Sequence, residues 1–561
     1  MKTNIIKTIA AFFSVAVTAV GCIQETFPMG STQTADQVGK SPVALEAMAN
    51  SLPAAMMTTN TAGYFTGYSV HTDFGIPAIH LMTEFMLEDI ATSGDNPYYN
   101  RFYAQALNQN QGSTYIYCAY FWSCYYQWIK GTNDIISSID PETTNPTIAK
   151  ILGQAYAYRA MFYLDLARMF EPKETKVAGY DVSKVLGLTV PIITETTKET
   201  DATSNPRATR EEMYAFILSD LDNAAKYLDG VTTTYTSPSI HVVNGLRARA
   251  YLEMGAAGDE GAYANAAKYA RLVIDESGKT PLTEAQWHDP STGFNDGSSN
   301  NAWLLGFKSS AENLGNIICF TAHMSTEATW GYAPLAQYCA SKSFYEQISY
   351  NDFRKYSWLD PEREKYMNKY KFAGTPEDAS LFLNGNPELS NPAALPYETL
   401  KFRPAGGEVH SYSSGNVTDH CMMRIEEMYF IEMEAKAAMG DLGGAGKLLD
   451  DFMKLRYTTG TYSCTRYTDS FENFAKEMLF QKRVEFWGEG IVFFDYKRLN
   501  IGITRGYPGT NHAAVYCLNC EGRSPQWNFV ITRGEFQSNK GITDETNNPD
   551  PSGLLPLWVE Q

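Results

Sequence analysis

The sequence is short of positive charge. Its 45 lysine and arginine residues stand against 63 aspartate and glutamate residues, which gives a formal net charge of -18. No basic cluster offsets this balance, and a chain of this charge repels phosphate groups. The composition therefore argues against nucleic-acid binding.

Motifs of metal and catalytic chemistry are also scarce. A single CxxC sequence joins Cys517 and Cys520, and His512 is the nearest histidine. A zinc site needs a second such pair or two histidines at ligand spacing. We therefore expect a local disulfide or two buried thiols there, and no metal or cofactor. The chain contains no nucleophile elbow, phosphate-binding loop or HExxH sequence.

Long apolar runs are missing beyond the first 21 residues. Those residues place two lysines before a short apolar stretch, which is typical of a signal peptide. Small residues followed by Cys22 resemble the lipobox of bacterial lipoproteins, so we predict that residues 1–21 are removed and Cys22 is lipidated. The alternative is an ordinary signal peptide with an incidental cysteine. Residues 22–40 then form the lipidated end and a polar tether. No later segment has about 18 or more consecutive apolar residues.

Helical periodicity dominates the chain after residue 40. Thr209 precedes Glu211 and Glu212, an order that favours a capped helix start. An extended run is expected at 186–193. We predict helices over residues 115–139, 150–170, 207–228, 239–255, 261–276, 422–439 and 442–456.

Several predicted helices form pairs with small residues at their contact faces. Pairs of about 34 residues with this pattern look like degenerate tetratricopeptide-type repeats. We predict a mainly α fold in which such repeats form a scaffold, together with an irregular, loop-rich region that contains short strands. The predicted parts are an N-terminal helical part at 41–276, a ligand-binding region at 277–420 and a C-terminal helical part at 421–561, in one compact unit.

Aromatic residues are plentiful, with 36 Tyr, 29 Phe and 9 Trp. Tyr and Trp have an apolar face and a polar edge, which suits recognition surfaces that are partly wet. Rings in polar, loop-like settings are the candidates for stacking on a ligand, although each is also consistent with packing beneath its own loop. The candidates are Trp330, Tyr332, Tyr98, Tyr99, Asn100 and Arg101, with Trp287 as a weaker one.

Residues 485–498, EFWGEGIVFFDYKR, place acids and bases in an apolar setting. Glu485 and Glu489 are four residues apart and would share one face of a helix, so a catalytic carboxylate pair is one interpretation. Nearby cations favour the other interpretation, a structural network of buried ion pairs. We predict one helix that ends near 488–490, a second helix beyond it, and ion pairs within one group of residues. That group is Arg483, Glu485, Glu489, Asp495 and Arg498.

The order of these segments resembles the SusD/RagB family of outer-membrane nutrient-binding lipoproteins. The resemblance rests on Cys22, on AYRAMFYLDLARMF at 157–170, on RIEEMYFIEMEAKAAMGD at 424–441 and on QKRVEFWGEGIVFFDYKR at 481–498. Relative to the family pattern, Gln481-Lys482 and Val492 are departures. Such a resemblance implies a surface-exposed protein, lipid-anchored to the outer membrane, that captures an oligosaccharide and passes it to a TonB-dependent transporter. It also implies that the chain is not an enzyme.

Other functions stay open beside this one. A secreted helical glycoside hydrolase needs two carboxylates about 5–10 Å apart across a cleft. A SusD-like protein that binds peptide or another non-glycan nutrient is a second alternative. A scaffold that binds only proteins is a third, because helical repeats commonly do so.

Overall fold

The computed structural model describes residues 38–39, 41–58, 71–92, 109–312, 314, 317–328, 330–332, 338–361 and 396–560. Within these residues the chain is mostly helical and its strands are short, which confirms the predicted fold class. None of the helices in the described part is long and apolar enough to cross a bilayer.

Helices of twelve or more residues build the scaffold. They are α3 (Pro42–Met56), α6 (Ile116–Ser138), α7 (Pro146–Phe170), α9 (Arg210–Leu228), α10 (Ile240–Ala256), α11 (Ala262–Glu276), α18 (Ile425–Ala438), α19 (Leu442–Met453) and α20 (Phe471–Phe486). The shorter helices are α4 (Ile76–Glu84), α8 (Glu199–Ala202), α12 (Glu284–Trp287), α13 (Phe320–Met324), α14 (Lys342–Gln347), α17 (Tyr412–Gly415), α21 (Val492–Leu499) and α22 (Arg533–Ser538). The strands are β1 (Ile90–Thr92), β2 (Trp303–Phe307), β3 (Tyr338–Ala340), β4 (His420–Arg424), β5 (Ile503–Thr504) and β6 (Asn519–Cys520).

The ends of the scaffold helices follow from local sequence. Asn145 caps α7 by accepting hydrogen bonds from the backbone N–H of Thr147 and Ile148, and Pro146 occupies the first turn, where its missing N–H costs nothing. At α9, Thr209 and Glu212 form a reciprocal capping box, which confirms the predicted cap. Both signals are local. The helix predicted at 150–170 therefore begins earlier than expected, at Pro146.

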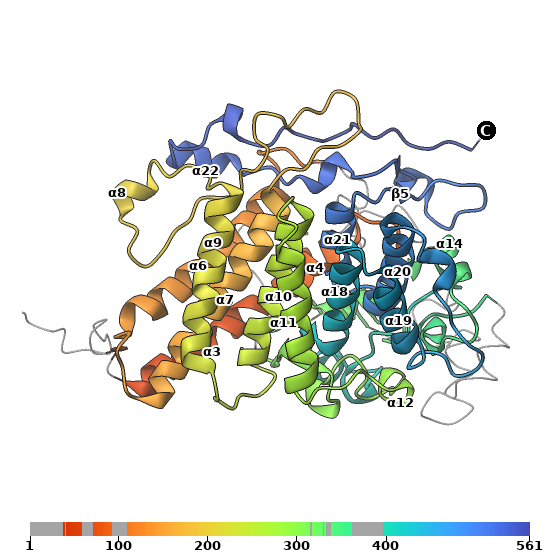
Figure 1. The fold of residues 1–561 in the computed structure, drawn as a ribbon, viewed down its shortest axis with the longest axis horizontal. Coiled ribbons are helices and arrows are strands. Elements are labelled where there is room, and N and C mark those ends of the chain that lie inside the picture. The colour runs from red at the N-terminus through yellow and green to blue at the C-terminus, as the bar shows by residue number, and fades with distance from the viewer. Residues whose placement is uncertain are drawn as a thin grey trace, which may run out of the picture.

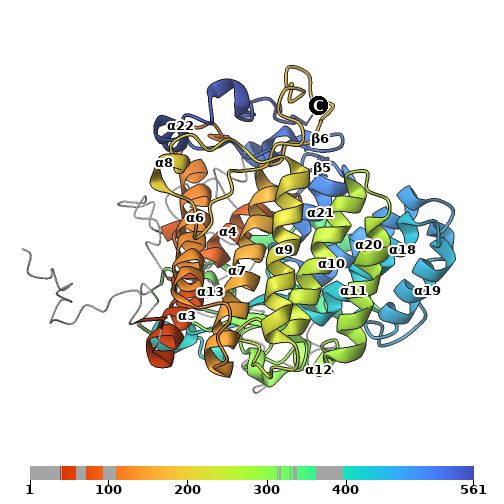
Figure 2. The same ribbon diagram turned by 60° about the vertical axis from the view of Figure 1, so that its left-hand side comes forward.

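The scaffold helices stand in a row that follows the order of the chain. In Figure 2, α6, α7, α9, α10, α11, α18 and α19 succeed one another across the molecule, and each packs against its neighbour in the row. Small residues allow the close approach that this arrangement needs. Ala248 and Ala250 of α10 and Ala266 and Ala270 of α11 are fully buried. This row is the degenerate helical repeat that the sequence predicts.

One predicted helix begins later than expected. Residues 422–424 belong to β4, which pairs antiparallel with β2, and α18 starts only at Ile425. The partner strand at Trp303–Phe307 is more than 100 residues away in the sequence, so local periodicity does not reveal the pairing. The pairing places Arg424 in the interior, where it is 1% exposed.

The irregular part between the helix pairs contains short elements, as expected. Within its described residues lie α12, α13, α14 and α17 together with β2 and β3. Strand β3 pairs with β1 and so joins this part to the N-terminal part. The sheets of the described chain have two strands each.

The C-terminal segment closes the ends of the helix row. In Figure 1 the chain after β5 runs across the upper ends of the helices towards the C-terminus. The backbone N–H of Arg533 donates to the carbonyl of Ser113, just before α6, at 2.8 Å. The backbone N–H of Lys540 donates to the carbonyl of Thr203, just after α8, at 2.7 Å. These bonds fasten the C-terminal segment to the N-terminal helical part.

Candidate functional site

The stretch at 485–498 forms the end of α20, a tight turn and all of α21 except its last residue, Leu499. Helix α20 ends at Phe486, and Gly488 and Gly490 adopt positive φ angles of 77° and 80°. The predicted break near 488–490 is confirmed. Glu485 and Glu489 therefore do not share one helical face, because the helix stops between them.

Glu485 is fully buried and accepts hydrogen bonds from three arginine side chains. Arg424 donates to Oε1 at 2.7 Å, and Arg354 donates to Oε2 at 2.9 Å. Arg456 donates to both oxygens, at 2.8 and 2.9 Å. Burial alone would raise the pKa of Glu485, but the charges of these arginines hold it well below its usual range.

Glu489 shares Arg424 with Glu485. Arg424 donates to both carboxylate oxygens of Glu489 at 3.0 Å, and Lys401 donates to one of them at 2.7 Å. The ammonium of Lys401 also donates to the carbonyls of Glu485 and Trp487. Burial opposes ionisation of Glu489, yet Arg424 and Lys401 lower its pKa.

These contacts belong to a buried cluster of ion pairs. Its positively charged and negatively charged side chains are equal in number. Asp352 pairs with Arg354, and Glu426 pairs with Arg424 and Arg456. We refer to this group as the ion cluster. Its members are Asp352, Arg354, Lys401, Arg424, Glu426, Arg456, Glu485 and Glu489.

Most of the ion pairs predicted within residues 483–498 are wrong, because these side chains pair with residues outside the segment. Arg483 pairs with Glu88 and Asp89, and Glu485 and Glu489 pair with the ion cluster. The predicted contact between Asp495 and Arg498 is present. Arg498 also pairs with Glu434, and Asp495 with Lys482. The true partners lie on other elements, at sequence distances that spacing within one segment cannot reveal.

The ion cluster supports a structural role for Glu485 and Glu489. A general acid near neutral pH needs a raised pKa, whereas both of these carboxylates have lowered pKa values. Both are also closed off from solvent, with exposed side-chain fractions of 0% and 7%. The catalytic-pair interpretation therefore lacks an accessible acid in this segment.

The rings predicted to form a stacking platform are buried where the structure describes them. Trp287 is 2% exposed, donates from Nε1 to Ser357 Oγ at 2.7 Å, and lies against the cations of the ion cluster. Trp330 is 9% exposed and Tyr332 is 3% exposed, and Tyr332 stacks on His323. Stacking on a ligand requires an open ring face, so these rings pack the interior here. Their role in binding stays a prediction.

Other predicted residues lie outside the described part of the chain. They are Cys22, Tyr98, Tyr99, Asn100 and Arg101. Cys517 and Cys520 are described, and both are buried free thiols, which matches one of the two expected states. Across the described residues no group of three or more His, Cys, Asp or Glu side chains could hold a metal ion.

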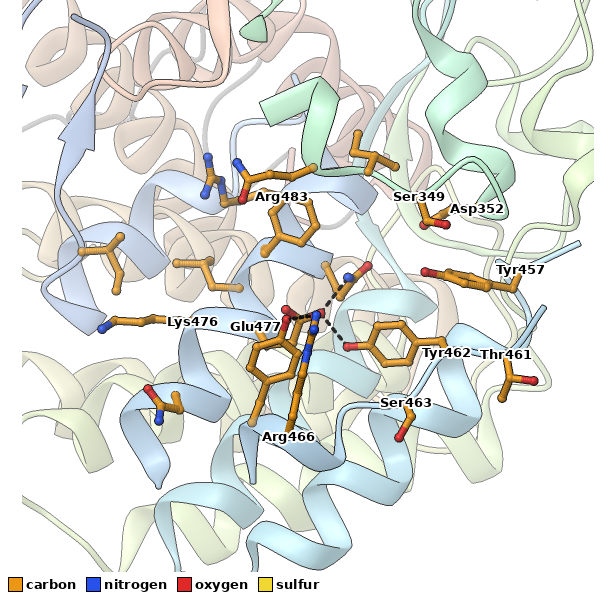
Figure 3. Close-up of a pocket in the computed structure, with 18 residues that line it drawn as sticks. Ser349, Asp352, Tyr457, Thr461, Tyr462, Ser463, Arg466, Lys476, Glu477 and Arg483 are labelled. Atoms are coloured by element: carbon orange, nitrogen blue, oxygen red, sulfur yellow. Dashed lines mark hydrogen bonds between the residues drawn. The ribbon is translucent and has the colours of Figure 1, made fainter. Parts of the chain in front are cut away.

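A pocket of about 710 Å³ is lined by residues 347–352 of the irregular part, by the loop after α19 and by α20 (Figure 3). Pockets of about 300–1,000 Å³ are typical of small-ligand sites. We call it the tyrosine pocket. Its described lining is Gln347, Ile348, Ser349, Asp352, Tyr457, Thr461, Tyr462, Ser463, Arg466, Tyr467, Asn473, Lys476, Glu477, Leu479, Phe480, Gln481, Arg483 and Ile501.

The loop between α19 and α20 supplies the tyrosine rings of this pocket and is held on both sides. The backbone N–H of Thr458 donates to the carbonyl of Asn351 at 2.9 Å. On the other side the backbone N–H of Cys464 donates to Asp450 Oδ1 of α19 at 2.8 Å. The loop is therefore fastened to rigid elements, which presents its tyrosines in a defined arrangement.

Tyr457 and Tyr462 form the aromatic wall of the pocket. Their ring centroids lie 5.7 Å apart at an interplanar angle of 68°, an edge-to-face contact. Both rings are half-buried. Burial raises the pKa of Tyr457 and of Tyr462, and the charge of Glu477 adds to the increase at Tyr462. Both phenols therefore stay protonated at neutral pH and can donate hydrogen bonds.

Polar groups surround this wall. The hydroxyl of Tyr462 donates to Glu477 Oε1 at 2.6 Å, as Figure 3 shows. The guanidinium of Arg466 lies over the ring of Tyr467, 4.6 Å from its centroid. Half-buried rings beside hydroxyl, amide, carboxylate and guanidinium groups match a ligand that has both apolar faces and polar edges.

Sequence reasoning missed this pocket, although a signal was present. The segment RYTTGTYSCTRY at 456–467 places three tyrosines in a Thr, Ser and Gly-rich stretch between two helices. This is the pattern that led to Trp330 and Tyr332. The segment lies in the predicted C-terminal helical part, outside the predicted ligand-binding region at 277–420.

The described chain is thus a scaffold of helical repeats that carries a tyrosine-lined pocket. Two family profiles match this chain. The one described as "Starch-binding associating with outer membrane" matches residues 78–252, and the one described as "SusD family" matches residues 291–550. Together they span most of the chain, and the chain belongs to the SusD/RagB family. A search of curated proteins found no match.

Solved structures share the fold. A SusD-like carbohydrate binding protein from Bacteroides vulgatus ATCC 8482 is 20% identical with a TM-score of 0.67, over 90% of this chain and 98% of that chain. A SusD superfamily protein from Bacteroides thetaiotaomicron VPI-5482 is 19% identical with a TM-score of 0.64, over 91% and 100%. Surface glycan-binding protein A from Bacteroides thetaiotaomicron is 16% identical with a TM-score of 0.61, over 90% and 98%.

Proposed function

We propose that this chain is a cell-surface lipoprotein that captures an oligosaccharide and delivers it to a TonB-dependent outer-membrane transporter. The observation that carries the proposal is the family match, because one matching profile is described as starch-binding and associated with the outer membrane. The predicted lipid anchor at Cys22 supports the same location.

We place the oligosaccharide in the tyrosine pocket. A sugar ring has apolar C–H faces, which fit the half-buried rings of Tyr457 and Tyr462, and hydroxyl groups, which fit polar side chains. Glu477, Asn473 and Ser463 line the same space and can bond to sugar hydroxyls. The pocket volume of about 710 Å³ suits a short oligosaccharide better than one ring.

The alternative functions receive less support. A glycoside hydrolase needs an accessible acid of raised pKa. Glu485 and Glu489 are buried, and the pKa of each is lowered. A peptide ligand also presents apolar and polar groups, so the tyrosine pocket is compatible with it. The choice between glycan and peptide therefore rests on the family match.

Calorimetric titration of the purified protein with oligosaccharides from a panel of plant, fungal and host polysaccharides tests the proposal. We expect binding of at least one oligosaccharide with one site per chain and no turnover of it. Binding of a peptide digest without binding of any glycan would contradict the proposal.

Co-purification from detergent-solubilised outer membranes tests the partner, and we expect a TonB-dependent transporter in the eluate.

A further inference from the structure

We propose that Gln481 is a positioning residue of the tyrosine pocket, which ties the pocket wall to the buried ion cluster. Gln481 lies on α20, lines the pocket and is 5% exposed. Its side chain bridges a buried cation and a carboxylate of the wall. The inference rests on the proposed function, because it assigns a role in holding the surface that binds the oligosaccharide.

The orientation of the Gln481 amide is fixed by charge. The guanidinium of Arg354 donates to Oε1 of Gln481 at 2.7 Å, and a guanidinium has no atom that can accept. The amide NH₂ therefore points the other way and donates to Glu477 Oε1 at 2.9 Å, where an ionised carboxylate can only accept. An amide satisfies both neighbours at once, since it accepts on one side and donates on the other.

The bridge continues to the aromatic wall. Glu477 Oε1, which receives the amide of Gln481, also receives the hydroxyl of Tyr462 (Figure 3). The carboxylate of Glu477 is thus held from α20 on one side and from the loop on the other. Because Tyr462 packs edge-to-face on Tyr457, the position of this carboxylate sets the position of both rings.

The inner end of the bridge does not move easily. Arg354 is fully buried, and its guanidinium also donates to Asp352 and Glu485. A backbone carbonyl, that of Gln481 itself, takes a further bond from Arg354 at 3.2 Å. The wall of the pocket is therefore anchored to the same cluster that closes the turn after α20.

The substitution Gln481→Glu separates this role from simple loss of packing. The new carboxylate still accepts from Arg354. It also places a second negative charge beside the carboxylate of Glu477, and two like charges in contact repel each other. When protonated, the new side chain donates an O–H to Glu477 as the amide does. The charged and titratable groups around it are Arg354 and Asp352 from the irregular part and Glu477 and Glu485 on α20. From the loop, Tyr462 donates to Glu477, Tyr467 interacts with the same carboxylate, and Arg466 donates to Tyr467.

The first readout is affinity for the oligosaccharide that the unmodified protein binds, measured by calorimetry between about pH 5 and pH 8. We expect Gln481→Glu to weaken binding about tenfold at the upper end, with recovery towards the lower end, while the unmodified protein changes little. Gln481→Met, which removes both bonds, should weaken binding at every pH. Gln154→Glu on α7, whose side chain is similarly buried at 8% exposed, is the control and should leave affinity unchanged.

The second readout needs no ligand. Hydrogen exchange of the backbone amides at 457–467 should be faster in Gln481→Glu than in the unmodified protein at high pH and equal to it at low pH. Exchange rates that are equal in Gln481→Glu and the unmodified protein at all pH values would overturn the positioning role. A loss of affinity in Gln481→Glu that is the same at all pH values would also overturn it. Absence of glycan binding in the unmodified protein would contradict the proposed function, while the exchange data still decide the role of Gln481.

Discussion

At the scale of single residues, the partners of a charge decide what it does. Glu485 has the position in the sequence of a candidate catalytic acid, yet three arginines surround it in the interior. Removing one member of a buried ion cluster leaves an uncompensated charge away from water, which costs far more than loss of an exposed pair. Glu485 is therefore expected to matter for stability.

The substitution Glu485→Gln tests this role. It keeps the size of the side chain and removes one negative charge, and we expect the free energy of unfolding to fall by about 3–5 kcal/mol. Chemical denaturation followed by circular dichroism measures the change. Glu472→Gln is the control, because Glu472 pairs with Lys476 on the exposed face of α20 and should show no measurable change. Equal stability of both variants would contradict a structural role.

At the scale of elements, the turn between α20 and α21 joins the ion cluster to the N-terminal part. Gly490 adopts a φ of 80°, and a Cβ atom built there would lie 2.3 Å from the Cβ of His80 on α4. The backbone N–H of Gly490 donates to Glu84 Oε1 at 2.9 Å. Only glycine combines this backbone conformation with such close approach.

We therefore expect Gly490→Ala to lower the free energy of unfolding by at least about 2 kcal/mol, from backbone strain and the clash with α4. Differential scanning calorimetry reports the effect as a lower Tm. Gly443→Ala in α19 is the matched control, since its Cβ would meet nothing within 4 Å and alanine favours a helix by about 0.5–1 kcal/mol. A Tm for Gly490→Ala as high as that of Gly443→Ala would contradict this account of the turn.

The same scale shows what could be predicted from the sequence. The starts of α9, α10 and α11 were predictable because caps and apolar spacing are local signals. The start of α18 was not, because β4 pairs with a strand more than 100 residues earlier.

The candidate site was less predictable for the same reason. The tyrosine pocket needs residues 347–352 and 457–483 to come together, and the partners of Glu489 lie 65 and 88 residues away. The burial of Trp287 could not be predicted, because an aromatic ring in a polar segment gives the same sequence pattern whether it faces solvent or covers buried cations.

At the scale of the whole molecule, the row of helices, the irregular part and the C-terminal segment pack against one another (Figure 1). The tyrosine pocket lies beside α20. The predicted anchor at Cys22 would hold this body at a membrane through the tether at 22–40. Cys22→Ser should release the protein into the soluble fraction after cell lysis, because the thiol predicted to carry the lipid is lost. Retention of the variant in the membrane pellet would contradict the lipoprotein prediction.

The central claim is that the tyrosine pocket binds the oligosaccharide. Its most direct test is the affinity of Tyr462→Ala for the oligosaccharide that the unmodified protein binds, measured by calorimetric titration. We predict a loss of about tenfold or more, because a stacked ring and its place in the wall disappear. Tyr412→Ala is the control, since Tyr412 is 45% exposed on α17 and does not line the pocket. Unchanged affinity in Tyr462→Ala, or an equal loss in Tyr412→Ala, would contradict the claim.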